Sequence, residues 1–401
     1  MSGQTEIMWG EEVLAGLVPE ENTQEEWKQT TLTGLIEVQN GYAFKSEDFS
    51  LTEGIPVVKI KNIASGELTL NGLQYYPHSV DKLSRFFIRK GDILIAMTGS
   101  HANQPSSIVG KVAKYDQDDF ALLNQRVGKI YSVDEEVLDN DFIYWFFKQW
   151  DVTFELAVSA GGSANQANIS TAQIKALELE LPPILEQHAI ASVLSSLDDK
   201  IDLLHRQNAT LEALAETLFR QWFVEEAKEE WEEGLLGDFF TLQRGFDLPI
   251  QDRVPGKFPI ITSSGYSAGH HEYKVKGPGV VTGRSGVIGK VFYVLEDFWP
   301  LNTSLFIKEY KLGTPLFSYF TLKFADLESF NAGSAVPTLN RNHVHAHVAA
   351  IPPKELIEAF EKMAYPHFEK MYKNTKQIQT LSNLRDTLLP KLMSGEVRVA
   401  Y

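Results

Sequence analysis

Two long segments of the chain carry apolar residues at alternating steps of four and three positions. In the first segment, from Leu181 to Trp222, the repeat falls on Ile190, Leu194, Leu197, Ile201, Leu204, Asn208, Leu211, Ala215, Leu218 and Trp222. In the second, from Ile351 to Met393, it falls on Phe360, Ala364, His367, Met371, Asn374, Ile378, Leu381, Arg385, Leu388 and Leu392. A seven-residue repeat is typical of a helix whose apolar stripe packs against another helix. The pattern therefore predicts two long helices.

The natural partner of each predicted helix is the other one, in an antiparallel pair, because each stripe is longer than one small domain could cover. The alternative is that each helix covers only the sheet of its own domain. Asn208 and Asn374 would fix the register of a paired seam at some cost in stability. Pro366 lacks a backbone donor, so we expect the second helix to kink or to begin near it.

The two helical segments belong to an internal duplication. Leu181-Pro182-Pro183 precedes the first and Ile351-Pro352-Pro353 precedes the second, 170 positions later. Upstream, Gly41 corresponds to Gly245, and Leu123-Asn124-Gln125 matches Leu301-Asn302-Thr303. Two similar domains predict a pseudo-two-fold molecule, which suits a two-part target such as paired half-sites on a duplex. The apolar framework positions of the two halves agree while the polar positions between them differ, and neutral drift of a duplicated domain explains this difference equally well.

Each half before its helix has the pattern of a strand-rich α/β domain. Short apolar and β-branched runs predict strands over Pro56–Ile60, Asp92–Met97, Gly128–Val133, Pro259–Thr262, Gly279–Thr282, Lys290–Leu295 and Thr303–Lys308. Helical spacing marks Asn140–Gln149 and Pro315–Ser329. We therefore expect an α/β (α+β) fold with mixed sheets, in five parts: an acidic tail 1–26, a domain 27–183, a helix 184–226, a domain 231–353 and a helix 354–397.

Composition limits the class of protein. The chain has 401 residues, no cysteine and a formal net charge of −16. The absence of cysteine excludes a disulfide scaffold and a thiolate metal site. No basic, apolar leader and no run of roughly 20 apolar residues is present, so we expect a soluble cytoplasmic protein. The negative charge is unfavourable for a free-standing DNA binder. Partner subunits must then supply much of the phosphate contact, or nucleic acid is not the ligand.

Motifs for catalysis were sought and none fits. Gly283 to Lys290 is one residue too long for a phosphate-binding loop, and Val291 stands where Ser or Thr would hold magnesium. His343, His345 and His347 alternate as on one face of a strand. We interpret them as a partly exposed strand edge, since no cysteine or carboxylate pair completes a metal site. The sequence therefore predicts a chain that is non-catalytic by itself, with no metal and no cofactor of its own.

The chain resembles the specificity subunit of type I restriction-modification enzymes from Trp27 to Val397. The resemblance rests on the following runs: Glu186-Gln187 after Leu-Pro-Pro, Leu197-Asp198-x-Lys200-Ile201, Leu218-Phe219-x-x-Trp222-Phe223, Thr282-Gly283-Arg284-Ser285-Gly286, Trp299-Pro300-Leu301-Asn302-Thr303 and Leu388-Leu389-Pro390-Lys391-Leu392. It implies two target recognition domains that each read half of a bipartite, asymmetric DNA sequence. The two long helices would separate these domains and dock two methyltransferase subunits.

The resemblance also implies the partners' chemistry. The methyltransferase subunits would use S-adenosylmethionine to methylate adenine, and motor/nuclease subunits would use ATP and magnesium. A helix of roughly 40 residues is about 60 Å long, enough to hold two reading domains more than one turn of B-DNA apart. The rival interpretation is a duplicated coiled-coil scaffold that binds proteins and never touches DNA.

Residue type marks candidates for DNA contact. Arginine suits guanine, asparagine and glutamine suit adenine, and lysine and glycine-rich turns suit phosphate. The candidates are Lys59, Lys61, Asn62, Ser100, His101, Asn103 and Gln104 in the first half, and Arg244, Ser263, Ser264, His270, Lys274, Arg284, Ser285, Lys290 and Arg341 in the second. Thr98-Gly99-Ser100 and the longer run after it are expected to form the counterpart of the Gly283–Lys290 loop. For each candidate alone, a solvated loop residue or turn former is an equally good interpretation.

Overall fold

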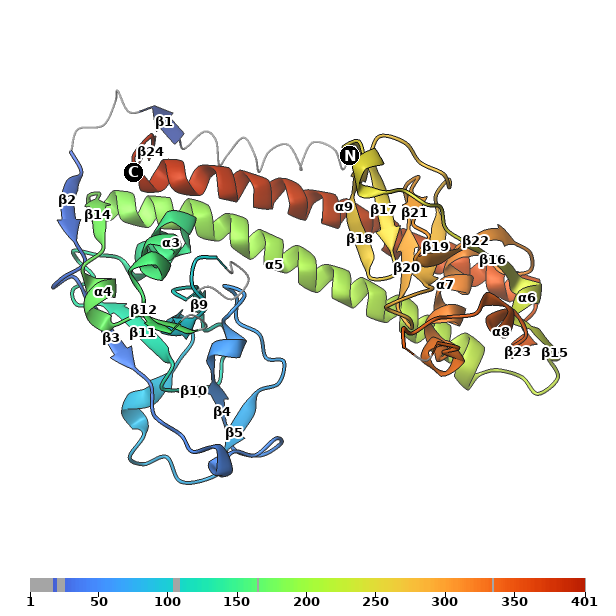
Figure 1. Ribbon diagram of the computed structural model, residues 1–401, viewed down its shortest axis with the longest axis horizontal. Helices are drawn as coiled ribbons and strands as arrows, with labels where there is room; N and C mark the ends of the chain where they lie inside the picture. The colour runs from blue at the N-terminus through green and yellow to red at the C-terminus, as the bar shows by residue number, and fades with distance from the viewer. Residues whose placement is uncertain (1–16, 20–25, 104–108, 164–165, 334, 401) are drawn as a thin grey trace. The chain divides into compact units, whose positions relative to one another are not determined.

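The computed structural model describes residues 17–19, 26–103, 109–163, 166–333 and 335–400 (Figure 1). The chain forms two compact units, one made of residues 1–200 with 381–401 and the other of residues 201–380. Only residues 17–19 and 26 of the predicted acidic tail are among the described residues. Two long helices, α5 (Ile184–Arg220) and α9 (Lys354–Met393), each contribute residues to both units. No helix of the described residues is both long and apolar enough to span a bilayer.

The first unit contains a four-stranded sheet in the order β3-β11-β7-β9, with a second sheet ordered β5-β4-β10-β6. Smaller sheets pair β14 with β2, β1 with β24, and β12-β13-β8. The strands are β1 (Leu17–Pro19), β2 (Lys28–Thr31), β3 (Ile36–Asn40), β4 (Ile55–Val58), β5 (Gln74–Tyr76), β6 (Phe87–Ile88), β7 (Ile93–Ala96), β8 (Thr98–Gly99), β9 (Val112–Lys114), β10 (Ala121–Leu123), β11 (Val127–Ser132), β12 (Gly161–Ser163), β13 (Gln166–Asn168), β14 (Glu178–Leu181) and β24 (Val397–Val399). The shorter helices are α2 (Asn140–Lys148), α3 (Trp150–Ser159) and α4 (Thr171–Lys175).

The second unit repeats this plan in fewer residues. Its main sheet has the order β16-β22-β19-β20, β18-β17-β21 corresponds to the sheet β5-β4-β10-β6, and β15-β23 corresponds to β14-β2. The strands are β15 (Glu232–Leu235), β16 (Phe240–Arg244), β17 (Phe258–Thr262), β18 (Gly265–His270), β19 (Gly279–Gly283), β20 (Val291–Val294), β21 (Trp299–Pro300), β22 (Ser304–Tyr310) and β23 (Val348–Ile351). The helices are α6 (Leu236–Phe239), α7 (Pro315–Phe324) and α8 (Arg341–His345).

Corresponding strands pair in the same sense in both units. β4 and β10 are parallel in the first unit, as β17 and β21 are in the second, while the main sheets are antiparallel. The strands predicted at Asp92–Met97 and Thr303–Lys308 are present as β7 and β22, and the helix predicted at Asn140–Gln149 is α2. The predicted fold class, two similar strand-rich units of mixed α/β type with two long helices, is confirmed.

Within each unit, a segment of α5 packs against a segment of α9. In the first, Leu194 and Leu197 share a buried cluster with Leu388 and Leu392. In the second, Ala215 and Phe219 share one with Phe360 and Ala364. Residue numbers rise along α5 as those of their partners fall along α9, so the segments run antiparallel. The same clusters include sheet residues, so the stripes cover both the other helix and the sheet.

Polar residues of the stripe meet one another across the helices. Asn374, which is fully buried, donates 2.8 Å hydrogen bonds from its Nδ2 to Asn208 Oδ1 and Gln207 Oε1. In the first unit the guanidinium of Arg385 pairs with Asp198 and, at 2.8 Å, with Asp386. Because buried donors must be satisfied, these contacts select the one register in which the polar groups face each other.

The expectation that the second helix begins near Pro366 is wrong, since α9 is helical throughout Lys354–Met393. Pro366 lies on the exposed side of the helix, as does Lys362, whose carbonyl would have accepted the missing backbone hydrogen bond. Water can therefore take the place of that donor, which removes the main reason for a break.

The strand interpretation of the alternating histidines is wrong. His343 and His345 lie on the short helix α8, and β23 begins only at Val348. Asn340 caps this helix, because its side chain accepts a 2.9 Å hydrogen bond from the backbone nitrogen of Asn342. His345 Nε2 accepts a 2.8 Å hydrogen bond from the backbone nitrogen of Leu242. Burial, followed by the positive charges of Lys311 and Arg341, lowers the pKa of His345 from its ordinary value of 6.5.

A buried ion pair anchors the C-terminal strand β24 to the first turn of α5. Glu186 is fully buried, and its Oε2 accepts a 2.6 Å hydrogen bond from Arg398 Nη2 and a 3.1 Å one from Trp27 Nε1. Next to it, buried Gln187 accepts from the backbone of Asp139 at 2.9 Å and donates to the carbonyl of Pro182 at 2.8 Å. The Glu186-Gln187 motif is thus structural, since both side chains are used inside the unit.

We predict that Arg398→Met lowers the free energy of unfolding of the first unit by about 3–5 kcal/mol, because it leaves the Glu186 carboxylate buried without its cation. Chemical unfolding followed by tryptophan fluorescence measures this loss. The double variant Glu186→Leu with Arg398→Met should recover most of it. Equal stabilities for wild type and Arg398→Met would contradict the structural role of the pair.

A second prediction concerns pH. Folding lowers the pKa of His345, so the folded state favours neutral imidazole, and this stabilisation is present above the unfolded pKa of about 6.5. It is lost as the pH falls from there toward the folded pKa. His345→Gln should therefore show a smaller drop in unfolding free energy between pH 7.5 and 5.5 than wild type. The control His343→Gln, an exposed residue of the same helix, should leave the drop unchanged. A drop of wild-type size in His345→Gln would refute the assignment.

Candidate nucleic-acid interface

In the second unit, three chain segments converge where β17 and β19 end and β22 begins. The backbone nitrogen of Arg284 donates a 2.9 Å hydrogen bond to the carbonyl of Thr303. The backbone nitrogen of Ser263 donates to Thr303 Oγ1 at 3.4 Å, and the backbone nitrogen of Leu301 donates to the carbonyl of Ile261 at 2.8 Å. We call residues 262–264, 284–286 and 302–303 the second corner.

The second corner carries a connected set of polar side chains. Arg284 Nη1 donates a 3.3 Å hydrogen bond to the carbonyl of Asn302. The Asn302 side chain donates to the carboxylate of Asp247, which also lies 3.6 Å from the guanidinium of Arg244. Arg244 is half exposed and Arg284 is partly exposed. Donors from these two arginines and acceptors from the Asn302 amide and the Asp247 carboxylate therefore reach solvent near one another. Such a mixture of groups can read base edges as well as phosphates.

A close backbone crossing fixes this corner in both units. A Cβ on Gly245 would lie 2.2 Å from the carbonyl oxygen of Leu301, and a Cβ on Gly41 would lie 2.2 Å from that of Asn124. Neither site can hold a side chain without moving the crossing strand. The matching glycines therefore place the same turn beside the same strand end in each unit.

Backbone hydrogen bonds define which residues of the first unit correspond to the second corner. Tyr42 donates to the carbonyl of Leu123 as Phe246 does to that of Pro300, both at 2.8 Å. Met97 donates to the carbonyl of Arg126 at 3.0 Å, as Arg284 does to that of Thr303.

The equivalent pairs are therefore Asn124 with Leu301, Gln125 with Asn302, Arg126 with Thr303, and Met97 with Arg284. The sequence match that set Leu123-Asn124-Gln125 on Leu301-Asn302-Thr303 is wrong by one position, because strand pairing overrides a shared Leu-Asn dipeptide. Likewise, Thr98 corresponds to Ser285. We call residues 59–61, 97–99 and 125–126 the first corner.

Sequence reasoning missed Gln125 and Arg126, which are both exposed. The sequence feature that could have indicated them is a polar residue followed by a basic one between two buried strands, β10 and β11. Residue identity alone did not align this turn correctly with its counterpart in the second unit. It also missed Asn302 and Asp247 in the second unit.

The candidates of the first unit occupy different environments. Asn62 is fully buried, where its Oδ1 accepts from the backbone of Lys59 at 3.1 Å and its Nδ2 donates to the carbonyl of Thr69 at 3.0 Å. The prediction that Asn62 touches DNA is therefore corrected to a structural role in its turn. Lys59 pairs with the Gln74 side chain and lies 3.3 Å from the Phe49 ring centroid. Burial, then the charge of Lys61, lowers the pKa of Lys59.

Of the remaining candidates of the first unit, Lys61 follows β4, and Ser100, His101 and Asn103 follow β7. Lys61 and Asn103 are exposed, His101 is partly exposed and Ser100 is buried. Gln104 lies outside the described residues. Lys61 and Asn103 therefore keep accessible side chains, and their part in DNA contact stays a prediction.

In the second unit, Ser263, Ser264, Arg284 and Ser285 are brought together at the second corner, with Ser263 buried and Ser264 exposed. Lys290 lies in the same β19–β20 loop, where its carbonyl accepts a 2.8 Å hydrogen bond from Thr282 Oγ1. Arg341 is exposed and follows Leu339, whose backbone nitrogen donates to the carbonyl of Arg284 at 2.8 Å. These contacts place both cations on chain segments adjoining the corner.

His270 and Lys274 do not belong to that corner. His270 pairs with Phe258 at the far end of the β17–β18 hairpin, and only 2% of it is exposed. Its Nδ1 lies 3.0 Å from the carbonyl of Val254, so the predicted DNA contact by His270 is corrected to a packing role. Lys274 is exposed and lies 4.6 Å from the ring centroid of Trp299. His270, His271 and Glu272 offer ligand atoms within 4.8 Å of one another, although two of the three are exposed.

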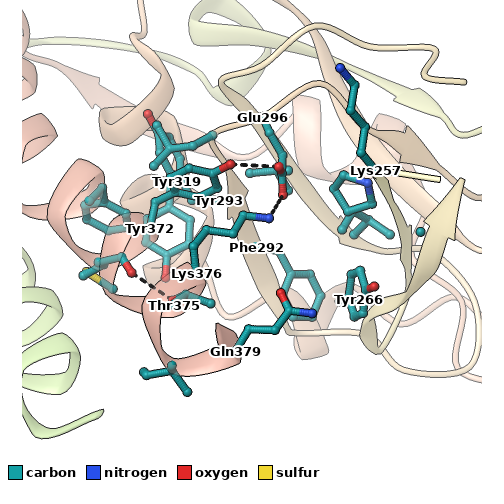
Figure 2. A pocket seen from close by; sticks show the side chains of 18 of the residues that line it. Lys257, Tyr266, Phe292, Tyr293, Glu296, Tyr319, Tyr372, Thr375, Lys376 and Gln379 are labelled. Atoms are coloured by element: carbon teal, nitrogen blue, oxygen red, sulfur yellow. Dashed lines mark hydrogen bonds and ion pairs between the residues drawn. The ribbon is translucent and has the colours of Figure 1, made fainter. Parts of the chain in front are cut away.

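A cavity of about 920 Å³ lies elsewhere in the second unit, between α9 and strands β17, β18 and β20 (Figure 2). Its wall is rich in aromatic side chains, including Tyr266, Phe292, Tyr319 and Tyr372. Glu296 within it is already paired, with Tyr372 Oη at 2.9 Å and Lys376 Nζ at 3.3 Å (Figure 2). Because these charges neutralise each other, the cavity suits an apolar or aromatic group better than a phosphate.

Comparisons with known proteins agree on one family. A family model described as the type I restriction modification DNA specificity domain matches residues 24–213 and 228–359. The MjaIX type I restriction enzyme specificity subunit of Methanocaldococcus jannaschii is 26% identical, over 65% of this chain and 69% of that protein. The EcoBI specificity subunit of Escherichia coli is 23% identical, over 94% of this chain and 87% of that protein.

The fold has a counterpart among solved structures. The S subunit of a type I restriction-modification system from M. genitalium matches 94% of this chain and 99% of its own, with a TM-score of 0.66 and 18% identity. At that identity the likeness concerns the fold. Because the family model covers most of both strand-rich units, the chain belongs to the type I restriction-modification DNA specificity domain family.

Proposed function

We propose that this chain is the sequence-reading subunit of a type I restriction-modification enzyme, in which each unit reads one half of a bipartite, asymmetric DNA target. The observation that supports it best is the repeated corner, with the same backbone hydrogen bonds in both units but different side chains. Because the backbone of the corner is the same in both units, both would approach a DNA duplex in the same way. Different side chains give them different half-sites.

The proposed DNA contacts follow from side-chain chemistry. In the second corner, Arg284 offers a fork of donors suited to guanine O6 and N7, and the amide of Asn302 suits adenine or a water-mediated contact. Ser264 and the exposed backbone near Gly286 suit phosphate oxygens. Lys290 and Arg341 would add phosphate contacts from adjoining segments.

The charge of the chain favours assembly before binding. A net charge of −16 opposes attraction to DNA, whose phosphates dominate affinity. We therefore propose that two methyltransferase subunits dock on the segments α5 and α9 and supply much of the phosphate contact. The two helices, each of which contributes to both units, would also set the spacing between the half-sites.

The chemistry would reside in the partners. S-adenosylmethionine would bind the methyltransferase subunits, which methylate adenine, and motor/nuclease subunits would use ATP and magnesium. This chain would hold no cofactor and would act by positioning the others, in the cytoplasm where the host DNA lies. The rival proposal, a scaffold that binds proteins without touching DNA, has no use for two corners with matched backbones and exposed arginines.

We predict that the isolated chain binds DNA weakly and that adding its methyltransferase subunits produces tight, sequence-specific binding that weakens steeply as salt rises. Fluorescence anisotropy with cognate and scrambled duplexes, at several salt concentrations, measures both states. Equal affinity of the assembled complex for cognate and scrambled DNA would support the scaffold interpretation instead.

A further prediction concerns Arg284→Ala. Loss of a bidentate contact to guanine costs about 1–3 kcal/mol, so methylation of cognate DNA should slow by about 5- to 150-fold. Selectivity should relax at a position of one half-site only. Arg253→Ala, at the far end of the β17–β18 hairpin where Arg253 Nε donates to the Leu248 carbonyl, is the matched control and should keep wild-type rates. Equal relaxation of both half-sites would argue against modular reading.

A further inference from the structure

We infer that Arg126 is a specificity-determining residue of the first unit, where it reads a guanine in the half-site that Arg284 does not read. This inference rests on the proposed function and adds a residue to it. Each unit has an equivalent pair of hydrogen-bonded backbone positions, and one arginine would occupy one position of that pair. The arginine lies on one strand of the pair in the second unit and on the other strand in the first unit.

The same cross-strand pair of backbone positions is present in both units. The backbone nitrogen of residue 97 donates to the carbonyl of residue 126 at 3.0 Å, and the backbone nitrogen of residue 284 donates to that of residue 303 at 2.9 Å. The flanking pairs also agree, since Ala96 lies opposite Val127 in the first unit and Gly283 opposite Ser304 in the second. The two pairs of positions are therefore structurally equivalent.

The occupants of these positions are exchanged between the units. The second unit has Arg284 and Thr303, whereas the first has Met97 and Arg126. Met97 is 7% exposed and belongs to the buried core cluster of the first unit, so it offers no polar group to a ligand. Thr303 accepts from the backbone of Ser263 and is used inside the corner. In each unit, therefore, one position of the pair holds an arginine, and the other holds a residue whose side chain packs or hydrogen-bonds inside the unit.

An arginine can reach the same region from either position. Neighbouring strands lie about 4.8 Å apart, and the arginine side chain is longer than that distance. Exchange between two hydrogen-bonded positions therefore keeps a guanidinium at the corner while changing the angle from which it approaches. A change of angle alters which base of a half-site the donor fork can meet.

The surroundings of Arg126 favour a role in binding. Arg126 is exposed and forms no ion pair with any residue that the structure describes. Its neighbour Gln125 is exposed as well, while a 2.8 Å hydrogen bond from the Gln125 backbone to the carbonyl of Tyr42 holds the turn in place. Lys61, on the equivalent of the Ser264 position, is exposed too. A free guanidinium on a fixed backbone, next to an amide, can recognise a base edge.

The test uses the full chain assembled with its methyltransferase subunits, and duplexes in which each position of the target is randomised. Sequencing of the methylated adenines then gives the preference at every position. We compare Arg126→Ala, Arg126→Lys and Arg284→Ala with wild type. Arg89→Ala is the matched control, since Arg89 is an exposed arginine that follows β6 at the opposite end of β10 from Arg126. Thermal unfolding of each variant confirms that the chain is folded.

Arg126→Ala should lower the methylation rate on cognate DNA by about 5- to 150-fold and relax one guanine position in one half-site. Arg126→Lys should relax the same position, because a lysine is a point charge without the fork of donors. Arg284→Ala should relax a position in the other half-site, and Arg89→Ala should leave all preferences unchanged.

Three results would overturn the inference: unchanged preferences in Arg126→Ala, a uniform loss of methylation with all preferences kept, which indicates a phosphate contact, or relaxation in the half-site read by Arg284. A wild-type complex with no bipartite preference would refute the proposed function itself. A wild-type complex that keeps its bipartite target while Arg126→Ala behaves normally would refute only the role of Arg126.

Discussion

The structure of each unit depends on the burial of two helix segments against each other and against a sheet. The first core contains Leu388 and Leu392, which follow Leu194 by about 190 positions in the chain and pack beside it. Each such leucine contributes roughly 1.5–3 kcal/mol when it is buried. Without α9 the apolar stripe of α5 would face water in both units. The last long helix is therefore part of the first unit's core, whatever else it binds.

Apolar burial alone would tolerate several registers of the helix pair, because leucines along a stripe are interchangeable. The polar contacts restrict this choice. Asn374 Nδ2 donates to Asn208 Oδ1 at 2.8 Å, and Arg385 pairs with Asp198, so a slip of one heptad would leave Asn374 buried without these partners and would separate Arg385 from Asp198. Glu186 and Arg398 add a similar constraint where β24 joins α5. These contacts contribute more to uniqueness than to net stability, since desolvation offsets much of their attraction.

The sequence was sufficient for the long-period features and insufficient for the local ones. A seven-residue repeat over some forty residues predicted α5 and α9, and alternating apolar runs predicted strands such as β7 and β22. Local residue patterns gave wrong predictions where a helix cap or a turn determined the backbone conformation instead. Three alternating histidines indicated a strand, yet the Asn340 cap starts a helix there. Pro366 indicated a helix that begins nearby, yet α9 continues through it, and its outer position leaves the affected carbonyl to solvent.

For the candidate interface, residue type suggested which residues could contact DNA but could not separate accessible side chains from buried ones. Asn62 and His270 were plausible readers by type, and both are enclosed with their polar atoms used. Aligning the two units was harder, because the Leu-Asn dipeptide that both contain suggested an alignment one residue away from the one that strand pairing gives. In that wrong alignment Arg126 has no equivalent among the candidates. Only backbone hydrogen bonds resolve a one-residue shift, since each such shift moves side chains to the other face of a strand.

Under the proposed function, the two corners would let one framework address two different DNA sequences. The glycines at 41 and 245 keep the backbone crossing, while the exposed residues around it vary. The central claim is that this chain determines which bases an associated methyltransferase selects. The most direct measurement maps methylated adenines across the genome of a host strain and of the same strain without this gene. The account predicts that a motif of two half-sites separated by a fixed spacer is methylated in the first strain only, whereas identical methylation in both strains would contradict it.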